Sequence, residues 1–237
     1  MVTVMNYLLQ LRRIGRTLIG KDFFATIDRD YPKQRLGSDY GGWDVMVDRI
    51  RPDSIIYSVG VGQDISFDLE MMNRFGVTIH AFDPTPKSIE WVRQQKLTQP
   101  FIMHEYGLAD FDGTVSFNPP ENAQHVSHTL LDRPTTQTNA ITVSVKCLET
   151  IMRELKHDRI DLLKMDIEGA EYQVIDSLAR SQIRPEQLLI EFHHRFPNVG
   201  CEKTKQAIRT LQSLRYSLFA ASRTGEEFSF VYEGAIC

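Results

Sequence analysis

Cysteine is scarce in this sequence, and several features that would point to a particular class of protein are absent. The 237 residues include three cysteines, Cys147, Cys201 and Cys237, and no CxxC or CxxH pair. This set disfavours a disulfide framework or a structural zinc site and favours a reducing compartment. No apolar run reaches the roughly 20 residues that a membrane-spanning helix needs.

The charge balance is mildly acidic, and a long basic run is also absent. Lys and Arg total 27 against 31 Asp and Glu, which gives a formal net charge of −4. Because nucleic-acid binding depends on neutralising phosphates, we expect no nucleic-acid partner. The 42% hydrophobic and 24% charged residues are typical of a globular protein. A chain of this length can build a stable hydrophobic core without disulfide bonds or a structural metal.

The first 20 residues have an amphipathic pattern. Three arginines at positions 12, 13 and 16 interrupt a row of apolar residues at helical spacing, namely Val4, Leu8, Leu11, Ile14 and Leu18. A signal peptide would carry its charge before the apolar stretch, so we expect a cytoplasmic protein. The pattern favours an amphipathic helix docked on the domain, and the alternative is a basic helix that contacts a membrane surface. We therefore predict an accessory segment at 1–45 and one domain at 46–237.

From residue 53 onward, short apolar runs alternate with helical patterns. Strands are predicted at 54–59, 77–82, 101–106, 160–165, 187–192, 216–220 and 228–232, and helices at 65–75, 86–95, 147–155, 170–179 and 204–214. The segments 114–117 and 141–145 alternate apolar and polar residues, which indicates an antiparallel insert around a long polar loop at 118–139. This order predicts an α/β fold with a seven-stranded, mainly parallel sheet, helices on both faces and an antiparallel last strand.

A nucleotide site is predicted where the first two strands end. Ligands of open α/β sheets bind beyond the carboxyl ends of the strands. Gly60 follows the first strand and allows a sharp turn, and Gly62 lets a ligand approach the backbone. Asp83 ends the second strand 23 residues after Gly60, where an acidic residue can bind ribose hydroxyls. The alternative for Asp83 is a helix cap.

The glycine turn suits a dinucleotide cofactor less well than a cofactor without phosphate groups. The third glycine of a dinucleotide fingerprint is missing, since Ile65 stands there, and Asp64 would repel a pyrophosphate. A cofactor with no phosphate and a cationic centre tolerates this acid. S-adenosylmethionine is such a cofactor, so Gly60, Gly62, Asp64 and Asp83 are candidates for binding it.

Three separated motifs resemble the FkbM family of S-adenosylmethionine-dependent methyltransferases. They are YSVGVGQDISFDLEMMNRFGVTIHAFDPTPKSIEWV at 57–92, LKMDIEGAE at 163–171 and LIEFHH at 189–194. The resemblance implies a Rossmann-like class I methyltransferase fold. It also implies methylation of a hydroxyl on a sugar, glycan or natural-product metabolite. Asp110 lies in a segment similar to one that contacts adenine in this family, which makes it a candidate for the same contact.

An alcohol acceptor must lose a proton during methyl transfer, so a base is expected near the cleft. Asp166 and Glu168 follow the fourth main strand and are candidate catalytic residues, with Asp166 also a candidate cofactor contact. For Glu171, a role at the site and a role as a partner of the helix dipole explain the residue equally well. His193 and His194 end the next strand and point to opposite faces if it continues, so either is a candidate base.

Other interpretations remain open at this point. Asp166, Glu191 and a histidine could also bind a divalent metal, although their spacing does not show it and no metal is predicted. An NAD-linked oxidoreductase fits the spacing from Gly60 to Asp83. A non-catalytic domain that binds a nucleoside or glycan fits the altered glycine turn.

Overall fold

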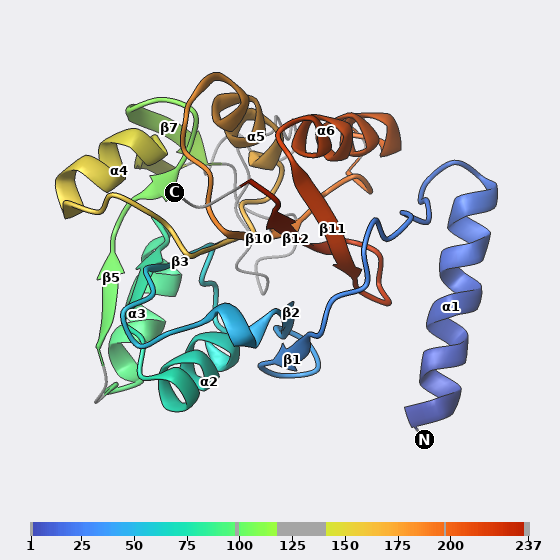
Figure 1. Cartoon of the computed structure of the whole chain (residues 1–237), viewed down its shortest axis with the longest axis horizontal. Coiled ribbons are helices and arrows are strands. Elements are labelled where there is room, and N and C mark those ends of the chain that lie inside the picture. The colour runs from blue at the N-terminus through green and yellow to red at the C-terminus, as the bar shows by residue number, and fades with distance from the viewer. Residues whose placement is uncertain (1, 98–99, 118–140, 197, 235–237) are drawn as a thin grey trace.

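The computed structural model describes residues 2–97, 100–117, 141–196 and 198–234 (Figure 1). The predicted polar loop at 118–139 lies outside the described residues. The helices are α1 (Val2–Leu18), η1 (Val47–Arg49, a 3-10 helix), α2 (Ser66–Phe75), α3 (Pro86–Gln94), α4 (Leu148–Leu155), α5 (Glu171–Arg180) and α6 (Cys201–Ser213). The strands are β1 (Gln34–Leu36), β2 (Trp43–Val45), β3 (Ile56–Val59), β4 (Ile79–Phe82), β5 (Phe101–His104), β6 (Gly107–Leu108), β7 (Gly113–Phe117), β8 (Ile141–Lys146), β9 (Leu162–Met165), β10 (Gln187–Glu191), β11 (Tyr216–Ala221) and β12 (Glu227–Tyr232).

The main sheet confirms the predicted fold. Its seven strands run in the order β11-β12-β10-β9-β3-β4-β5. Neighbours from β10 to β5 pair in parallel, whereas β12 is antiparallel to both β10 and β11. Every residue of β3 and β9 is buried, because helices cover both faces of a parallel sheet.

Helices cover the two faces of the sheet in separate groups. One core joins the sheet to α4, α5 and α6, and the other joins it to α2, α3 and the β1–β2 hairpin. Figure 1 shows these groups on opposite sides of the strands. Each helix therefore buries its apolar stripe against the sheet.

The strand order reverses at β3, which has β4 on one side and β9 on the other. The chain crosses over in opposite directions from this point, so the loops after these three strands separate and leave a crevice. A small sheet of order β6-β8-β7 lies after β5, and β7 pairs with β8 antiparallel as predicted. This insert brings Leu108 and Phe117 to the same crevice.

The N-terminal helix is expected from the sequence to pack its apolar row on the domain, and the structure differs from this expectation. In its described part, Leu11, Ile14 and Leu18 are 54%, 46% and 82% exposed. Figure 1 shows α1 standing outside the sheet beyond β11. Arg13 is the residue of this part that is buried, so a polar contact and not the apolar row attaches the helix.

Three histidines gather on the sheet face that faces α4. The Nδ1 atom of His80 lies 3.2 Å from Nε2 of His104, and the hydroxyl of Tyr57 lies 2.8 Å from Nδ1 of His157. Burial, together with the charges of the neighbouring histidines, lowers the pKa of His80 to about 4. Burial also lowers the pKa of His104 and His157, so the folded protein holds these rings in the neutral form.

This cluster makes the fold sensitive to acid. Between pH 6.5 and 4 the unfolded chain binds protons that the folded histidines do not, so the free energy of unfolding falls as the pH falls through this window. His80→Gln removes one of these groups and reduces that fall by about 1–2 kcal/mol, after allowance for the partial exposure of the ring. Urea denaturation of both proteins at pH 7 and pH 4.5 measures the difference. An equal fall in both proteins would contradict the assignment.

Candidate active site

A cavity lies at the carboxyl ends of β3, β4 and β9. It holds about 590 Å³ of empty space, including its open mouth. One part of the wall is apolar and includes Phe82, Leu108 and Phe117. The other part carries the carboxylates of Asp83, Asp166 and Glu168, and no basic residue lines the cavity among the described residues. The cavity therefore favours a ligand that is partly apolar and positively charged.

The glycine turn after β3 forms the floor of this cavity. Gly60 has φ +76°, and a Cβ atom placed there would lie 1.7 Å from the carbonyl oxygen of Asp166. Gly62 has φ +58° and has no atom within 4 Å of its would-be Cβ. Gly60 is therefore required by the close approach of two backbones, and Gly62 leaves open space beside the cavity.

Asp83 ties the end of β4 to the glycine turn. Its side chain is nearly buried, and Oδ2 accepts the backbone N–H of Gly62 at 3.0 Å. Oδ1 accepts the N–H and the hydroxyl of Thr85 at 2.9 and 2.6 Å. Asp83 thus holds Thr85, which is itself the N-cap residue of α3, so the interpretation of Asp83 as the cap is wrong. Asp83 also lines the cavity. Oδ2 accepts one of these bonds and retains lone-pair capacity toward a ligand.

A second cluster of acids surrounds His193. Its Nε2 atom lies 3.6 Å from Asp166, 3.5 Å from Glu168 and 4.0 Å from Glu191. On the other side of the ring, Nδ1 lies 2.9 Å from Oε1 of Glu171. The imidazole of His193 is therefore held between a buried carboxylate and the acids at the cavity.

Glu171 is the residue of this site whose role the sequence did not reveal. Its side chain is fully buried and accepts the backbone N–H groups of Ile167 and Gly169 at 3.0–3.2 Å. These bonds hold the turn in which Glu168 has the unusual φ of +54°. Glu171 therefore fixes both the turn and the ring of His193, and it is a positioning residue. The acid that ends the motif DIEGAE is the available signal, but it also fits a helix dipole.

The burial and charges of this cluster raise the pKa values of both Asp166 and His193. Burial and the neighbouring acids, chiefly Glu168, raise the pKa of Asp166 to about 7, although His193 opposes the shift. Burial resists protonation of His193, but the charges of Glu171, Glu168 and Asp166 outweigh it and raise the pKa of His193 well above its usual value. At neutral pH the ring therefore holds a proton, which makes it a poor proton acceptor.

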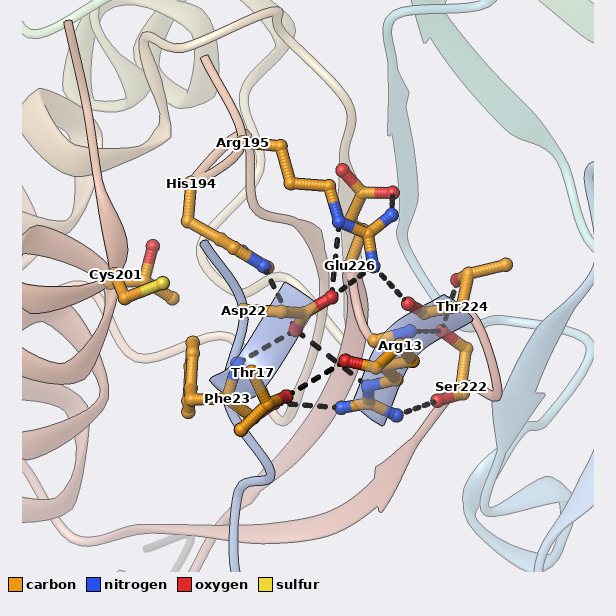
Figure 2. A network of polar contacts seen from close by, with 12 residues as sticks. Arg13, Thr17, Asp22, Phe23, His194, Arg195, Cys201, Ser222, Thr224 and Glu226 are labelled. Atoms are coloured by element: carbon orange, nitrogen blue, oxygen red, sulfur yellow. Dashed lines mark hydrogen bonds and ion pairs between the residues drawn. The ribbon is translucent and has the colours of Figure 1, made fainter. Parts of the chain in front are cut away.

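His194 points away from the cavity. Its Nε2 atom lies 3.4 Å from Oδ1 of Asp22, and burial lowers the pKa of the ring to about 4. Figure 2 shows His194 beside Asp22 and Arg195 in a polar network on the side of the N-terminal segment. The two histidines thus lie on opposite sides, but β10 ends at Glu191, so both follow the strand and its alternation does not place them. The position of His194 does not support its role as the base.

Two further candidates for cofactor binding also lie outside the cavity wall. Asp64 accepts the backbone N–H of Ser66 and the hydroxyl of Ser38, both at 2.8 Å, so it joins the start of α2 to the preceding loop. Asp110 lies 3.8 Å from Arg180 in an ion pair. Neither residue lines the cavity, and the local contacts of each carboxylate explain its position.

One set of side chains has the geometry for a metal ion. Asp166, Glu171 and His193 each offer a ligand atom, and these atoms lie within 4.8 Å of one another. Imidazole with two carboxylates suits several divalent metals. However, Nδ1 of His193 and Oε1 of Glu171 are already joined by a hydrogen bond, so a metal would have to replace that bond.

Comparison with known proteins identifies a family model and two curated relatives. The model described as Methyltransferase FkbM domain matches residues 55–218. Probable methyltransferase-like protein 24 of Rattus norvegicus is 27% identical over 156 residues, which cover 65% of this chain and 36% of the relative. The protein of the same name from Homo sapiens is 28% identical over 145 residues, or 60% of this chain and 33% of the relative. The chain spans about a third of the length of these relatives.

Two solved structures show weak similarity. The methyltransferase FkbM from Methylobacillus flagellatus has a TM-score of 0.49 and 13% identity, covering 77% of this chain and 44% of that chain. The fibrillarin of Aeropyrum pernix, solved with natively bound S-adenosyl-L-methionine, has a TM-score of 0.39 and 10% identity, covering 87% and 86%. At this level, neither structure carries an inference about this chain.

The two glycines of the turn are expected to differ in their tolerance of a side chain. Gly60→Ala forces a methyl group into the carbonyl of Asp166 and should cost about 3 kcal/mol or more of stability. Gly62→Ala meets open space and should cost only the left-handed backbone penalty of about 1–2 kcal/mol. Chemical denaturation of the two variants beside the wild type measures these costs. Equal losses would show that the close approach of the backbones is not the limiting contact.

Proposed function

The chain belongs to the FkbM methyltransferase family, and we propose that it transfers a methyl group from S-adenosylmethionine to a hydroxyl group. The proposed acceptor is a sugar, glycan or natural-product metabolite. The observation that carries the proposal is the acid-lined cavity where the strand order reverses. Its position suits a nucleoside, and its negative charge suits a sulfonium while it opposes the pyrophosphate of a dinucleotide.

The residues of the cavity fit the parts of this cofactor. Asp83 would accept hydrogen bonds from the ribose hydroxyls, because its carboxylate is fixed at the end of β4 by Gly62 and Thr85. The apolar wall, which includes Leu108 and Phe117, would cover the adenine. The open space above Gly62 leaves room for the remaining part of the cofactor. When bound, S-adenosylmethionine supplies a methyl group on a positively charged sulfur. An acceptor oxygen can attack the methyl carbon in line, and the sulfur leaves as the thioether of S-adenosylhomocysteine.

Asp166 is the residue proposed to take the proton of the acceptor hydroxyl. It lines the cavity, and its Oδ1 atom is buried 3.6 Å from Nε2 of His193, with no hydrogen-bond partner among the described residues. A pKa of about 7 places this carboxylate close to the value that suits a general base at neutral pH. His193, held by Glu171, keeps a positive charge beside Asp166 and orients it. Glu168 lies on the same side of the cavity and is proposed to help position the acceptor.

Equilibrium binding tests the cofactor. Titration calorimetry is expected to detect binding of S-adenosylmethionine and S-adenosylhomocysteine, but not of NAD. Asp83→Ala removes charge-assisted hydrogen bonds and should weaken binding by about tenfold to a hundredfold. The control is Asp158→Ala, whose side chain is 91% exposed and lies outside the cavity lining. Binding of NAD without the sulfonium cofactor would overturn the proposal.

The pH dependence of turnover tests the base. Asp166 can accept a proton only when ionised, so the rate should rise as the pH increases through about 7 and then level off. Asp166→Asn should lower kcat by about 10²–10⁴-fold. Calorimetry on this variant separates a lost proton acceptor from lost cofactor binding.

Transfer of labelled methyl groups to pooled glycan and metabolite fractions provides the assay. Asp158→Asn is the control for a lost carboxylate outside the cavity. An unchanged rate and pH profile in Asp166→Asn would remove Asp166 from the proton step.

A further inference from the structure

The N-terminal helix is attached to the domain by its polar side. Arg13 is 8% exposed, and its guanidinium donates to the carbonyl oxygens of Phe23 at 3.0 Å and Ser222 at 3.2 Å. It also lies 3.7 Å from the carboxylate of Asp22. Figure 2 shows Arg13 reaching both the 22–23 segment and the turn between β11 and β12. A buried cation with several partners fixes which side of α1 faces the domain.

The opposite side of α1 carries an exposed apolar row. Two residues along a helix correspond to about 200° of rotation, so Leu11 lies across the helix from Arg13. Ile14 and Leu18 follow Leu11 at the spacing that places residues on one face, and all three are 46–82% exposed. Ile19 directly follows the helix and is 67% exposed. A helix that serves only its own domain buries such a row, whereas this one turns it outward.

The charge of this segment is opposite to that of the rest of the chain. Residues 1–21 contain four basic side chains and no acidic one, giving +4. The whole chain carries −4, so the remaining residues carry −8. Arg12 and Lys21 are exposed, and Arg16 is half-buried. An outward apolar row flanked by exposed cations is the arrangement of a helix that lies in a membrane interface.

We propose that α1 docks the protein on an anionic membrane surface. The helix would lie parallel to the bilayer. Leu11, Ile14 and Leu18 would insert among the outer parts of the acyl chains, and the exposed basic side chains would contact the headgroups. No described helix is long and apolar enough to cross a bilayer. Charge selects this occupant over a second copy of the chain, because the exposed cations of the two segments would repel each other along a shared apolar face, whereas Arg13 is already paired with Asp22.

Vesicle sedimentation with the full chain tests the proposal. The protein is expected to bind vesicles containing one quarter phosphatidylserine at least tenfold more tightly than pure phosphatidylcholine. Raising sodium chloride from 50 to 500 mM should weaken binding, because headgroup attraction is screened. Leu11→Glu with Leu18→Glu should weaken it by a further tenfold or more. Equal binding to both lipid compositions would overturn the proposal.

A matched double variant controls for the added charge. Ile102→Glu with Phe111→Glu also replaces two exposed apolar side chains, which are 43% and 47% exposed and lie outside α1. This variant should bind vesicles like the wild type, and both variants should keep the wild-type unfolding midpoint. Equal loss in both would show that net charge alone decides binding. Dimerisation in ultracentrifugation that is lost in Leu11→Glu with Leu18→Glu would instead identify a second copy as the occupant.

Discussion

The close approach of two backbones at the ends of β3 and β9 is the constraint on which the site depends. The turn at Gly60 lies against the carbonyl of Asp166 so tightly that no side chain fits between them. This contact brings the loop after β3 and the loop after β9 to one cavity. Asp83 then joins the turn from the next strand through Gly62. Three loops that are distant in sequence are thereby held in one arrangement before any ligand arrives.

Electrostatics gives this cavity its character. Asp166, Glu168, Glu171 and Glu191 all lie within 4.0 Å of the ring of His193, and one imidazolium cannot balance four carboxylates. Part of the excess is removed by protonation, since burial and Asp166 raise the pKa of Glu191 to about 9. Part is offset by the backbone N–H groups that Glu171 accepts. The remaining negative potential is the property that supports the proposed cationic methyl donor.

Much of this arrangement could be predicted from the sequence, because periodicity and turn residues report local structure. The predicted strands and helices of the sheet are present, with ends that differ by at most three residues. The sequence predicts Gly60, Asp83 and Asp166 at the cavity because each follows an apolar strand, and parallel strands share their carboxyl edge. The family match over residues 55–218 includes all three motifs that carried the resemblance.

The remainder depends on contacts that spacing does not encode. Glu171 is a normal helix-start residue in the sequence, and only the folded turn shows its carboxylate directed back to His193. Asp64 and Asp110 have the right sequence positions, but hydrogen bonds to Ser66 and an ion pair with Arg180 account for their carboxylates. An amphipathic pattern likewise does not specify which face of α1 meets the domain. In the structure the polar face meets the domain, because Arg13 on that face is buried.

A crystal structure of the full chain with S-adenosylhomocysteine is the most direct test of the central claim. The account predicts the ribose hydroxyls within hydrogen-bond distance of Asp83 and the adenine beside Leu108 and Phe117. It also predicts the sulfur on the side of the cavity that carries Asp166. A nucleoside bound elsewhere, or a ribose that makes no contact with Asp83, would contradict it.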